Sequence, residues 1–453
     1  MRLASSFRDP HGFVFERDGI IYRQVNEAHE AHFAAFLSSG LYERLVQEGL
    51  LVRHEEVTLD LAAEPGAIHV LRPERIQFVS YPYEWGFLQL RDAATLTLRV
   101  QELALDHGMS LRDASAFNVA FRGSRPVFID TTSFEILPEG RPWVAYRQFC
   151  EHFLAPLALM AYRDVRMGQL TRVWLDGIPL DLAAGLLPSR ASVRPGLAMH
   201  LRMHARTQRT RASDRSSRDR TFSPQAFRGL IESLLKAVEG LTEPAGYSVW
   251  RDYYGEADHY TDAAAREKER VVASWLEELQ PTCVWDLGAN TGRFARLASS
   301  SADTVAFDLD PFCVDEAYRR ARADGDERLL PLVMDLANPS PGVGWMNEER
   351  SGVWARGSAD LVLALALIHH LAIGRNVPLP AFAETLSRSG RHAIVEWVPK
   401  DDPKVTVLLR DRADVFGGYS REGFEAAMAP HFHVGGVEPL PGSDRLLYRL
   451  RRR

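Results

Sequence analysis

The sequence contains little cysteine and no long apolar run. Its 453 residues include three cysteines, Cys150, Cys283 and Cys313, which are isolated and lack the spacing of metal ligands. So few thiols exclude a disulfide framework and predict a reducing, cytoplasmic compartment. The first residues lack the pattern of a signal peptide, and the longest apolar run, which ends near Ile373, is too short to span a bilayer. We therefore expect neither a membrane segment nor a metal site.

Lysine is also scarce, because none occurs before Lys236. The net charge of −6 gives no general attraction to nucleic acid. Arginines cluster only in residues 189–220, among serine, threonine and histidine. This segment could contact phosphate or RNA, but a solvated linker is the favoured interpretation. An apolar content of 46% allows a chain of this length to bury about two or three separate cores.

The most informative segment is 284–292, in which an apolar run leads into Asp-x-Gly-x-x-x-Gly. Glycines allow the backbone to approach a ligand. A side chain at Gly288 would collide with a bound nucleoside cofactor, and Gly292 allows close packing where the next helix starts. The dinucleotide fingerprint Gly-x-Gly-x-x-Gly is absent, which favours methyl transfer over hydride transfer.

Further apolar runs with acidic ends predict a parallel sheet. Asp308 ends the second run, where a carboxylate can accept hydrogen bonds from both ribose hydroxyls, and Asp335 ends the third. Asp310 can equally cap the helix that begins after Pro311. The fourth run, 358–371, is continuously apolar, as a strand buried on both faces requires. Further strands are expected at 392–398, 432–434 and 445–450, and helices at 312–323 and 379–387, which gives repeated β-α units and a final hairpin-like pair.

With these landmarks in this order, residues 281–453 resemble class I S-adenosylmethionine (SAM) dependent methyltransferases, in part those related to nodulation proteins. The resemblance implies an α/β fold with a Rossmann-like seven-stranded sheet, SAM as cofactor, and a small-molecule or glycan acceptor. It implies cofactor contacts from Asp286, Gly288, Ala289, Asn290, Gly292, Asp308, Leu309, Asp335, Leu336, Ala364, Tyr260 and Lys268. No Asn/Asp-Pro-Pro-Tyr motif follows the fourth strand, so an oxygen acceptor is the leading hypothesis.

Three residues are candidates for catalysis in this half. His369 and His370 follow the fourth strand and could either touch the substrate or pack beside the cofactor. Glu396 sits inside an apolar strand, where an unpaired charge is costly, so it either forms structural hydrogen bonds or faces the site. The polar residues at 401–404 either line the same edge of the sheet or form a solvated loop.

A second signal lies in the N-terminal half. Asp113 is followed by Asn118 and then by an apolar run that ends at Asp130. This spacing resembles the catalytic loop of protein kinases. The resemblance implies that Asp113 orients an acceptor hydroxyl while Asn118 and Asp130 hold magnesium against phosphates. A predicted helix at 92–107 and a hinge-like segment at 76–85 fit the same α+β fold.

The departures from the kinase pattern are equally informative. The lysine that anchors ATP phosphates is missing, so an arginine such as Arg23 would have to replace it. No glycine-rich phosphate loop is visible, and Thr131-Thr132-Ser133 stands where kinases have Phe-Gly. A kinase-like lobe with lost or altered phosphotransfer is favoured over an active kinase, although its intact acids could still bind a phosphorylated ligand or nucleotide. In the plainer alternative, Asp113 and Asn118 merely form turns.

The predicted organisation has five segments: a β-rich kinase-like lobe with a helix near 31–47 (1–85), a helical kinase-like lobe (86–200), an arginine-rich linker (201–220), a helical lead-in (221–280) and the methyltransferase domain (281–453). Three functions remain open at this point. The chain is a methyltransferase with a kinase-like accessory lobe for substrate or partner binding, a bifunctional methyltransferase and kinase, or a SAM-binding scaffold without catalysis.

Overall fold

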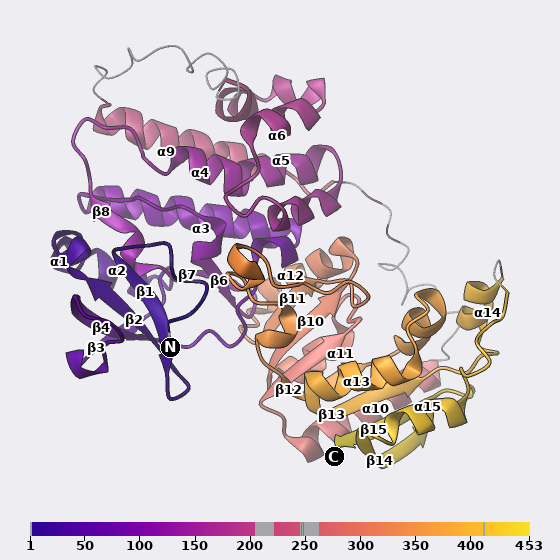
Figure 1. The fold of residues 1–453 in the computed structure, drawn as a ribbon. Helices are drawn as coiled ribbons and strands as arrows, with labels where there is room; N and C mark the ends of the chain where they lie inside the picture. The colour runs from indigo at the N-terminus through magenta and orange to yellow at the C-terminus, as the bar shows by residue number, and fades with distance from the viewer. Residues whose placement is uncertain (1, 204–221, 245, 247, 249–261, 411–412) are drawn as a thin grey trace. The chain divides into compact units, whose positions relative to one another are not determined.

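The computed structural model describes residues 2–203, 222–244, 246, 248, 262–410 and 413–453. Within these residues the chain forms two compact units, each built from more than one segment (Figure 1). Unit 1 comprises Met1–Phe121, Arg125–Ala245 and Gly342–Ser351, and unit 2 comprises Arg122–Ser124, Gly246–Pro341 and Gly352–Arg453.

Unit 1 begins with a four-stranded antiparallel sheet. Its strands are β1 (Gly12–Arg17), β2 (Ile20–Asn26), β3 (His54–Val57) and β4 (Ala67–Pro73), in the order β1-β2-β4-β3. Between β2 and β3 the chain forms α1 (Glu30–Ser38) and α2 (Leu41–Gln47). One helix was expected over 31–47, but Gly40 has a φ of +78°, which ends the first helix and starts the second. The segment 76–85, expected to resemble a hinge, follows β4 and contains a 3-10 turn at Pro82–Glu84.

The rest of unit 1 is mainly helical. Helix α3 (Phe87–Asp106) buries one face, and α5 (Ala155–Tyr162) and α9 (Pro224–Glu239) pack against it. Because α9 belongs to unit 1, the predicted helical lead-in is divided between the units. The remaining elements are α4 (Tyr146–Phe149), α6 (Leu180–Leu186), α7 (Pro195–Leu197), the two-stranded sheets β5 (Met109–Leu111) with β8 (Phe134–Ile136) and β6 (Val119–Arg122) with β7 (Arg125–Phe128), and π-helical turns at Cys150–Leu154 and Ala198–Met203.

Only the start of the predicted arginine-rich linker falls within the described residues. Positions 201–203 complete the π-helical turn Ala198–Met203, so the helical part of unit 1 extends slightly beyond the boundary expected at 200. Upstream, Arg190 and Arg194 donate hydrogen bonds to the backbone carbonyls of Tyr162 and Gly240. These two arginines therefore contribute to the folded unit.

Unit 2 contains a mixed seven-stranded sheet, as the sequence predicted. The strand order is β11-β10-β9-β12-β13-β15-β14, and the last two strands form an antiparallel pair. The strands are β9 (Cys283–Leu287), β10 (Asp303–Asp308), β11 (Leu329–Val333), β12 (Ala359–Ala364), β13 (Gly390–Trp397), β14 (Phe432–Pro439) and β15 (Leu446–Arg452). Strand β12 is shorter than its apolar run, because the chain turns at Ala366, where φ is +51°.

Helices flank this sheet and bury its apolar side chains. They are α10 (Asp262–Leu279), α11 (Arg293–Ser299), α12 (Pro311–Asp324), α13 (Leu379–Ser389), α14 (Pro403–Leu409) and α15 (Arg421–Met428). Trp275 and Val272 of α10 share a buried cluster with Val284 of β9 and Leu363 of β12. Within the parts of the chain that the structure describes, no helix combines the length and the apolar character needed to cross a membrane.

Candidate cofactor and methyl-transfer site

The glycine-rich turn after β9 has the backbone that its sequence requires. Gly288, Asn290 and Gly292 all have positive φ, at +75°, +53° and +78°. The amide of Gly288 donates to the carbonyl oxygen of Phe307 on β10 at 2.8 Å, which fixes the turn against the neighbouring strand. A Cβ at Gly292 would lie 3.3 Å from that of Ala317 on α12, so glycine permits the close packing that was predicted.

A methyl group at Gly288 would meet the protein itself. An added Cβ would lie 3.0 Å from Cδ1 of Leu367, in a backbone conformation that side chains rarely adopt. Gly288 also lines the cavity described below. Its small size therefore preserves both the turn and the opening.

The carboxylate at the end of β10 contacts this turn, and a second carboxylate follows two residues later. Asp308 accepts hydrogen bonds from the backbone amides of Asn290 at 2.7 Å and Asp310 at 2.9 Å. Burial raises the pKa of Asp308 to about 6. Asp310 accepts from the amide of Phe312 at 2.9 Å and caps α12, which was the plainer of its two interpretations. Only Asp308 of these two lines the cavity.

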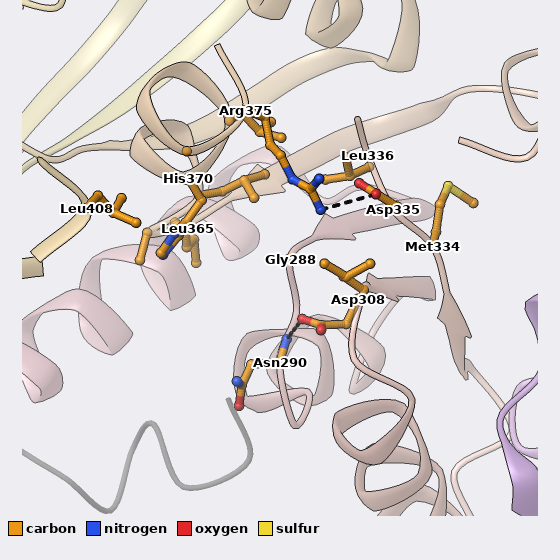
Figure 2. A pocket seen from close by; sticks show the side chains of 15 residues that line it. Gly288, Asn290, Asp308, Met334, Asp335, Leu336, Leu365, His370, Arg375 and Leu408 are labelled. Atoms are coloured by element: carbon orange, nitrogen blue, oxygen red, sulfur yellow. Dashed lines mark hydrogen bonds and ion pairs between the residues drawn. The ribbon is translucent and has the colours of Figure 1, made fainter. Parts of the chain in front are cut away.

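The cavity lies beside the carboxyl ends of β9, β10, β11 and β12, where open α/β sheets bind ligands, and measures about 310 Å³ (Figure 2). Asp335 follows β11, accepts from the amide of Ala337 and lies 3.4 Å from a guanidinium nitrogen of Arg375. The cavity is lined by Gly288, Asn290, Asp308, Leu309, Met334, Asp335, Leu336, Leu365, Ala366, Leu367, His370, Leu371, Gly374, Arg375 and Leu408.

The cavity includes many of the predicted site residues. Those that line it are Gly288, Asn290, Asp308, Leu309, Asp335, Leu336 and His370. Those that lie outside its wall are Asp286, Ala289, Gly292, Ala364, Lys268, His369 and Glu396. Tyr260 lies outside the described residues.

The two histidines occupy different environments. His369 is fully buried, and its ring centroid lies 4.0 Å from that of His370. His370 lines the cavity. Burial, together with the charges of Arg445 and Lys404, lowers the pKa of His370 to about 4. His370 is therefore neutral near pH 7 and can accept a proton.

Glu396 is buried and paired. One carboxylate oxygen lies 2.5 Å from the ammonium nitrogen of Lys268, and the other lies 3.1 Å from Arg445. Arg445 also makes two contacts with Asp402, at 2.7 and 3.0 Å. Asp402 caps α14, so this part of residues 401–404 is an anchored helix start rather than a solvated loop. Both oxygens of Glu396 are thus paired with cations, which is what the structural interpretation expects.

Several cavity residues had not been predicted. Leu365, Ala366 and Leu367 belong to the apolar run that was assigned to the fourth strand, and the positive φ of Ala366 bends them into the wall. Arg375 follows the π-helical turn His370–Gly374 that the histidines start. In the sequence, the position of Arg375 five residues after His370 is the feature that could have identified it as a site residue.

The kinase-like positions of unit 1 come together in space. Asp113 accepts hydrogen bonds from the amide of Ser115 and the side chain of Gln148, and burial and the nearby Asp130 raise its pKa. Asn118 donates to the Ser133 hydroxyl, which donates to Asp130 at 2.7 Å. Asp113 and Asp130 also each accept a hydrogen bond from the amide two residues later, as the turn interpretation expects.

The residues present in unit 2 fit SAM. Carboxylates at two neighbouring strand ends can accept hydrogen bonds from a nucleoside, an open glycine turn admits its chain, and the volume suits a small cofactor. The sheet order, its reversed strand and this cavity define a class I SAM-dependent methyltransferase, with SAM as its cofactor.

The comparison with known proteins gives the family. The chain is 37% identical over 461 aligned positions to nodulation protein NoeA of Rhizobium meliloti (strain 1021), covering 100% of this chain and 96% of the relative. The chain therefore belongs to the NoeA family. No protein-family model matches the sequence.

Several solved structures are similar to part of the chain. The N-methyltransferase NodS from Bradyrhizobium japonicum WM9 is 13% identical with a TM-score of 0.32, covering 43% of this chain and 98% of its own. The magnesium protoporphyrin IX methyltransferase ChlM from Synechocystis PCC 6803 is 18% identical with a TM-score of 0.31, covering 45% and 98%. The bifunctional kinase-methyltransferase WbdD is 18% identical with a TM-score of 0.31, covering 42% and 40%. TM-scores this low carry no inference about this chain.

Proposed function

We propose that the chain methylates an oxygen of a small-molecule or glycan-type acceptor, in the cytoplasm, with unit 1 recruiting the substrate or a partner. The observation that carries this proposal is the convergence of the glycine turn, Asp308, Asp335 and a neutral His370 on one cavity. The acids lie at the ends of β10 and β11, whereas His370 follows β12 (Figure 2). One side of the cavity wall is therefore acidic and would hold the cofactor. The other side is apolar, contains His370 and would hold the acceptor.

SAM, when bound, supplies a methyl group on a sulfonium that leaves readily. The protein mainly aligns donor and acceptor and removes a proton if the acceptor is a hydroxyl. His370 is the proposed acceptor of that proton because it lines the cavity and is neutral near pH 7, although its lowered pKa makes it a weaker base than an exposed histidine. Leu365, Leu367 and Leu408 line the same cavity and exclude water from the transfer. Glu396 is not the proposed base, because two cations occupy its carboxylate.

An untargeted labelling experiment can identify the acceptor. The full chain is incubated with SAM carrying a labelled methyl group and with a lysate of its own source, and labelled products are identified by mass spectrometry. We expect a methyl ether or ester on a small molecule or glycan. Label on nitrogen or carbon would contradict the oxygen assignment. A Gly288→Asp variant, which should not bind SAM, provides the background.

We further propose that unit 1 is kinase-like in fold but does not transfer phosphate efficiently. The supporting features are the strand order β1-β2-β4-β3, the position of α3 before the loop, and the convergence of Asp113 with Asn118 and Asp130. The carboxylate of Asp130 is already engaged by Arg23, Thr132 and Ser133. A phosphorylated ligand or nucleotide would bind there only by displacing these partners.

A bifunctional methyltransferase and kinase is the alternative. It predicts magnesium-dependent transfer of labelled phosphate from ATP to a lysate component or to the chain, lost in Asp113→Ala. We expect no such transfer, and SAM binding unchanged in Asp113→Ala. Transfer that depends on Asp113 would establish the bifunctional alternative. A scaffold without catalysis would bind SAM yet label nothing in the lysate.

A further inference from the structure

A line of charged side chains with alternating sign runs toward the cofactor cavity of unit 2. Asp402 pairs with Arg445, Arg445 with Glu396, and Glu396 with Lys268. Their side chains are between 0% and 6% exposed, so none of these charges is strongly screened by water. The four side chains come from α10, β13, the residue before β15 and the cap of α14. Buried charges persist when each has an opposite partner, and this part of the line is balanced.

The line continues beyond Lys268 with acids only. The charge of Lys268 acts on Asp286 of β9, and Asp286 in turn lies close enough to Asp308 to feel its charge. Asp286 is 3% exposed and accepts a hydrogen bond from the backbone of Ala295 in α11. Asp308 accepts hydrogen bonds from backbone amides, which carry no net charge, and Asp310 adds another negative charge beside it. Asp335 and Arg375, which also line the cavity, pair with each other and add no net charge. Among the described residues, the end of the line nearest the cavity therefore holds more carboxylates than cations.

We propose that this acidic end recognises the positive charge of the cofactor, so that the site binds SAM in preference to the neutral product S-adenosylhomocysteine (SAH) and releases a proton when SAM binds. The proposal rests on SAM being the cofactor. SAM differs from SAH by the methyl group and the charge of the sulfonium, so shape alone discriminates them poorly. An excess of buried carboxylates can distinguish SAM from SAH by charge, because Coulomb interactions are stronger where water is excluded.

The protonation state of the acids supports this assignment. Burial, with the neighbouring charge of Asp308, raises the pKa of Asp286 to about 7 despite Lys268, and burial raises that of Asp308 to about 6. Asp286 is thus partly protonated in the free protein near pH 7. A bound cation favours the ionised carboxylate and lowers its pKa, so a proton leaves. The preference for SAM should grow as pH rises toward 7 and level off above it.

Three ligands of similar shape provide the test. SAM carries a sulfonium, sinefungin carries an ammonium at the same place, and SAH carries neither. We expect isothermal titration of the full chain at pH 6.5, in phosphate and in Bis-Tris, which both buffer at this pH and differ in heat of ionisation, to show proton release with SAM and sinefungin and little with SAH. Between pH 5.5 and 8, the affinity for SAM should rise roughly tenfold more than that for SAH, the scale of one coupled ionisation.

Asp286→Asn removes the proposed sensor. In this variant the affinities for SAM and SAH should converge and the proton release should disappear. Asp303→Asn, at the amino end of β10, is the matched control and should behave as the wild type. Equal pH dependence and equal proton release for SAM and SAH in the wild type would overturn the proposal without any variant. If neither ligand binds, the cofactor assignment itself fails, which is a separate result.

Discussion

The guanidinium of Arg23 lies 2.7 Å from the carboxylate of Asp130 in unit 1. Arg23 comes from β2 and also donates to the hydroxyl of Thr132, two residues after Asp130. Burial would raise the pKa of Asp130, but the charge of Arg23 and the hydroxyls of Ser133 and Thr132 hold it below its usual range. An internal cation thus neutralises the acid that a kinase would give to magnesium. This arrangement supports the proposal that phosphotransfer is lost.

Replacing Arg23 by glutamine should destabilise unit 1. The side chains of Arg23 and Asp130 are largely buried, at 13% and 14% exposure. The substitution would leave the buried carboxylate of Asp130 without its cation, which should lower the free energy of unfolding by about 3 kcal/mol. Because the pKa of folded Asp130 is depressed, its stabilisation is present above the ordinary Asp pKa and is lost as pH falls through the lower, folded value. Urea titrations should therefore show a large difference between variant and wild type at pH 7 and a smaller one near pH 3.

Arg44→Gln is the control for this substitution. Arg44 of α2 is 53% exposed and pairs with Glu48, the residue after the helix, and pairs at the surface contribute little. We expect a change below about 0.5 kcal/mol. Equal losses for Arg23→Gln and Arg44→Gln would show that the contact with Asp130 does not stabilise the unit.

Gly288→Asp should abolish binding of SAH and SAM. The added side chain would be forced into a positive-φ backbone with its Cβ 3.0 Å from Leu367, and its charge would project beside Asp308. Gly325→Asp is the matched control, since Gly325 also has positive φ, at +66°, but has open space around it and does not line the cavity. Calorimetry should show no binding in the first variant and affinity within about twofold of wild type in the second. Retained affinity in Gly288→Asp would refute the role of this turn.

The sequence predicted the sheet of unit 2 because its strands are buried on both faces and end in acids. Val284, Asp308 and Asp335 mark three successive strands, and their order along the chain can be read from the sequence alone. The long apolar run after position 358 misled the prediction of the fourth strand. Hydrophobicity marks burial, and it cannot separate a strand from a turn such as Ala366 that lines an apolar cavity.

The sequence does not predict ion pairs between residues that are far apart along the chain. Glu396 could be recognised as a costly charge in an apolar strand, but its partners Lys268 and Arg445 are far away along the chain. The same holds for Arg23 and Asp130. The sequence indicated that an arginine such as Arg23 would replace the missing lysine, but it did not predict that Arg23 contacts Asp130. Boundaries were also hard to place, because the apolar face of α9 does not reveal that it packs on α3.

The two ion pairs of Arg445, with Glu396 and with Asp402, should be essential for the stability of unit 2. Arg445 is fully buried, so Arg445→Met would leave Asp402 without a cation and Glu396 with Lys268 alone. We expect a loss of about 3 to 5 kcal/mol in the free energy of unfolding of unit 2. Arg449→Met, in strand β15, which Arg445 precedes, changes an arginine whose side chain is 20% exposed and should cost far less. Chemical denaturation followed by Trp fluorescence would measure both, and similar losses would contradict the buried network.

His370→Gln should separate binding from catalysis. Glutamine keeps a polar side chain in the cavity but cannot accept the proton, so turnover should fall about a hundredfold while SAM affinity stays near wild type. Because the pKa of His370 is lowered to about 4, the base is already neutral at pH 5 and above. At saturating SAM, the turnover of the wild type should therefore be flat between pH 5.5 and 8 and should decline only as pH falls toward 4.

The control for this variant is His392→Gln, since His392 lies near the amino end of β13 and does not line the cavity. Turnover should be unchanged there. His369→Gln should instead lower stability, because His369 is fully buried against His370. If His370→Gln retained full turnover, or if its loss were matched by loss of SAM affinity, the proton would have to leave by another route. An acceptor that is already ionised, or a water at the open side of the cavity, would then be favoured over a histidine base.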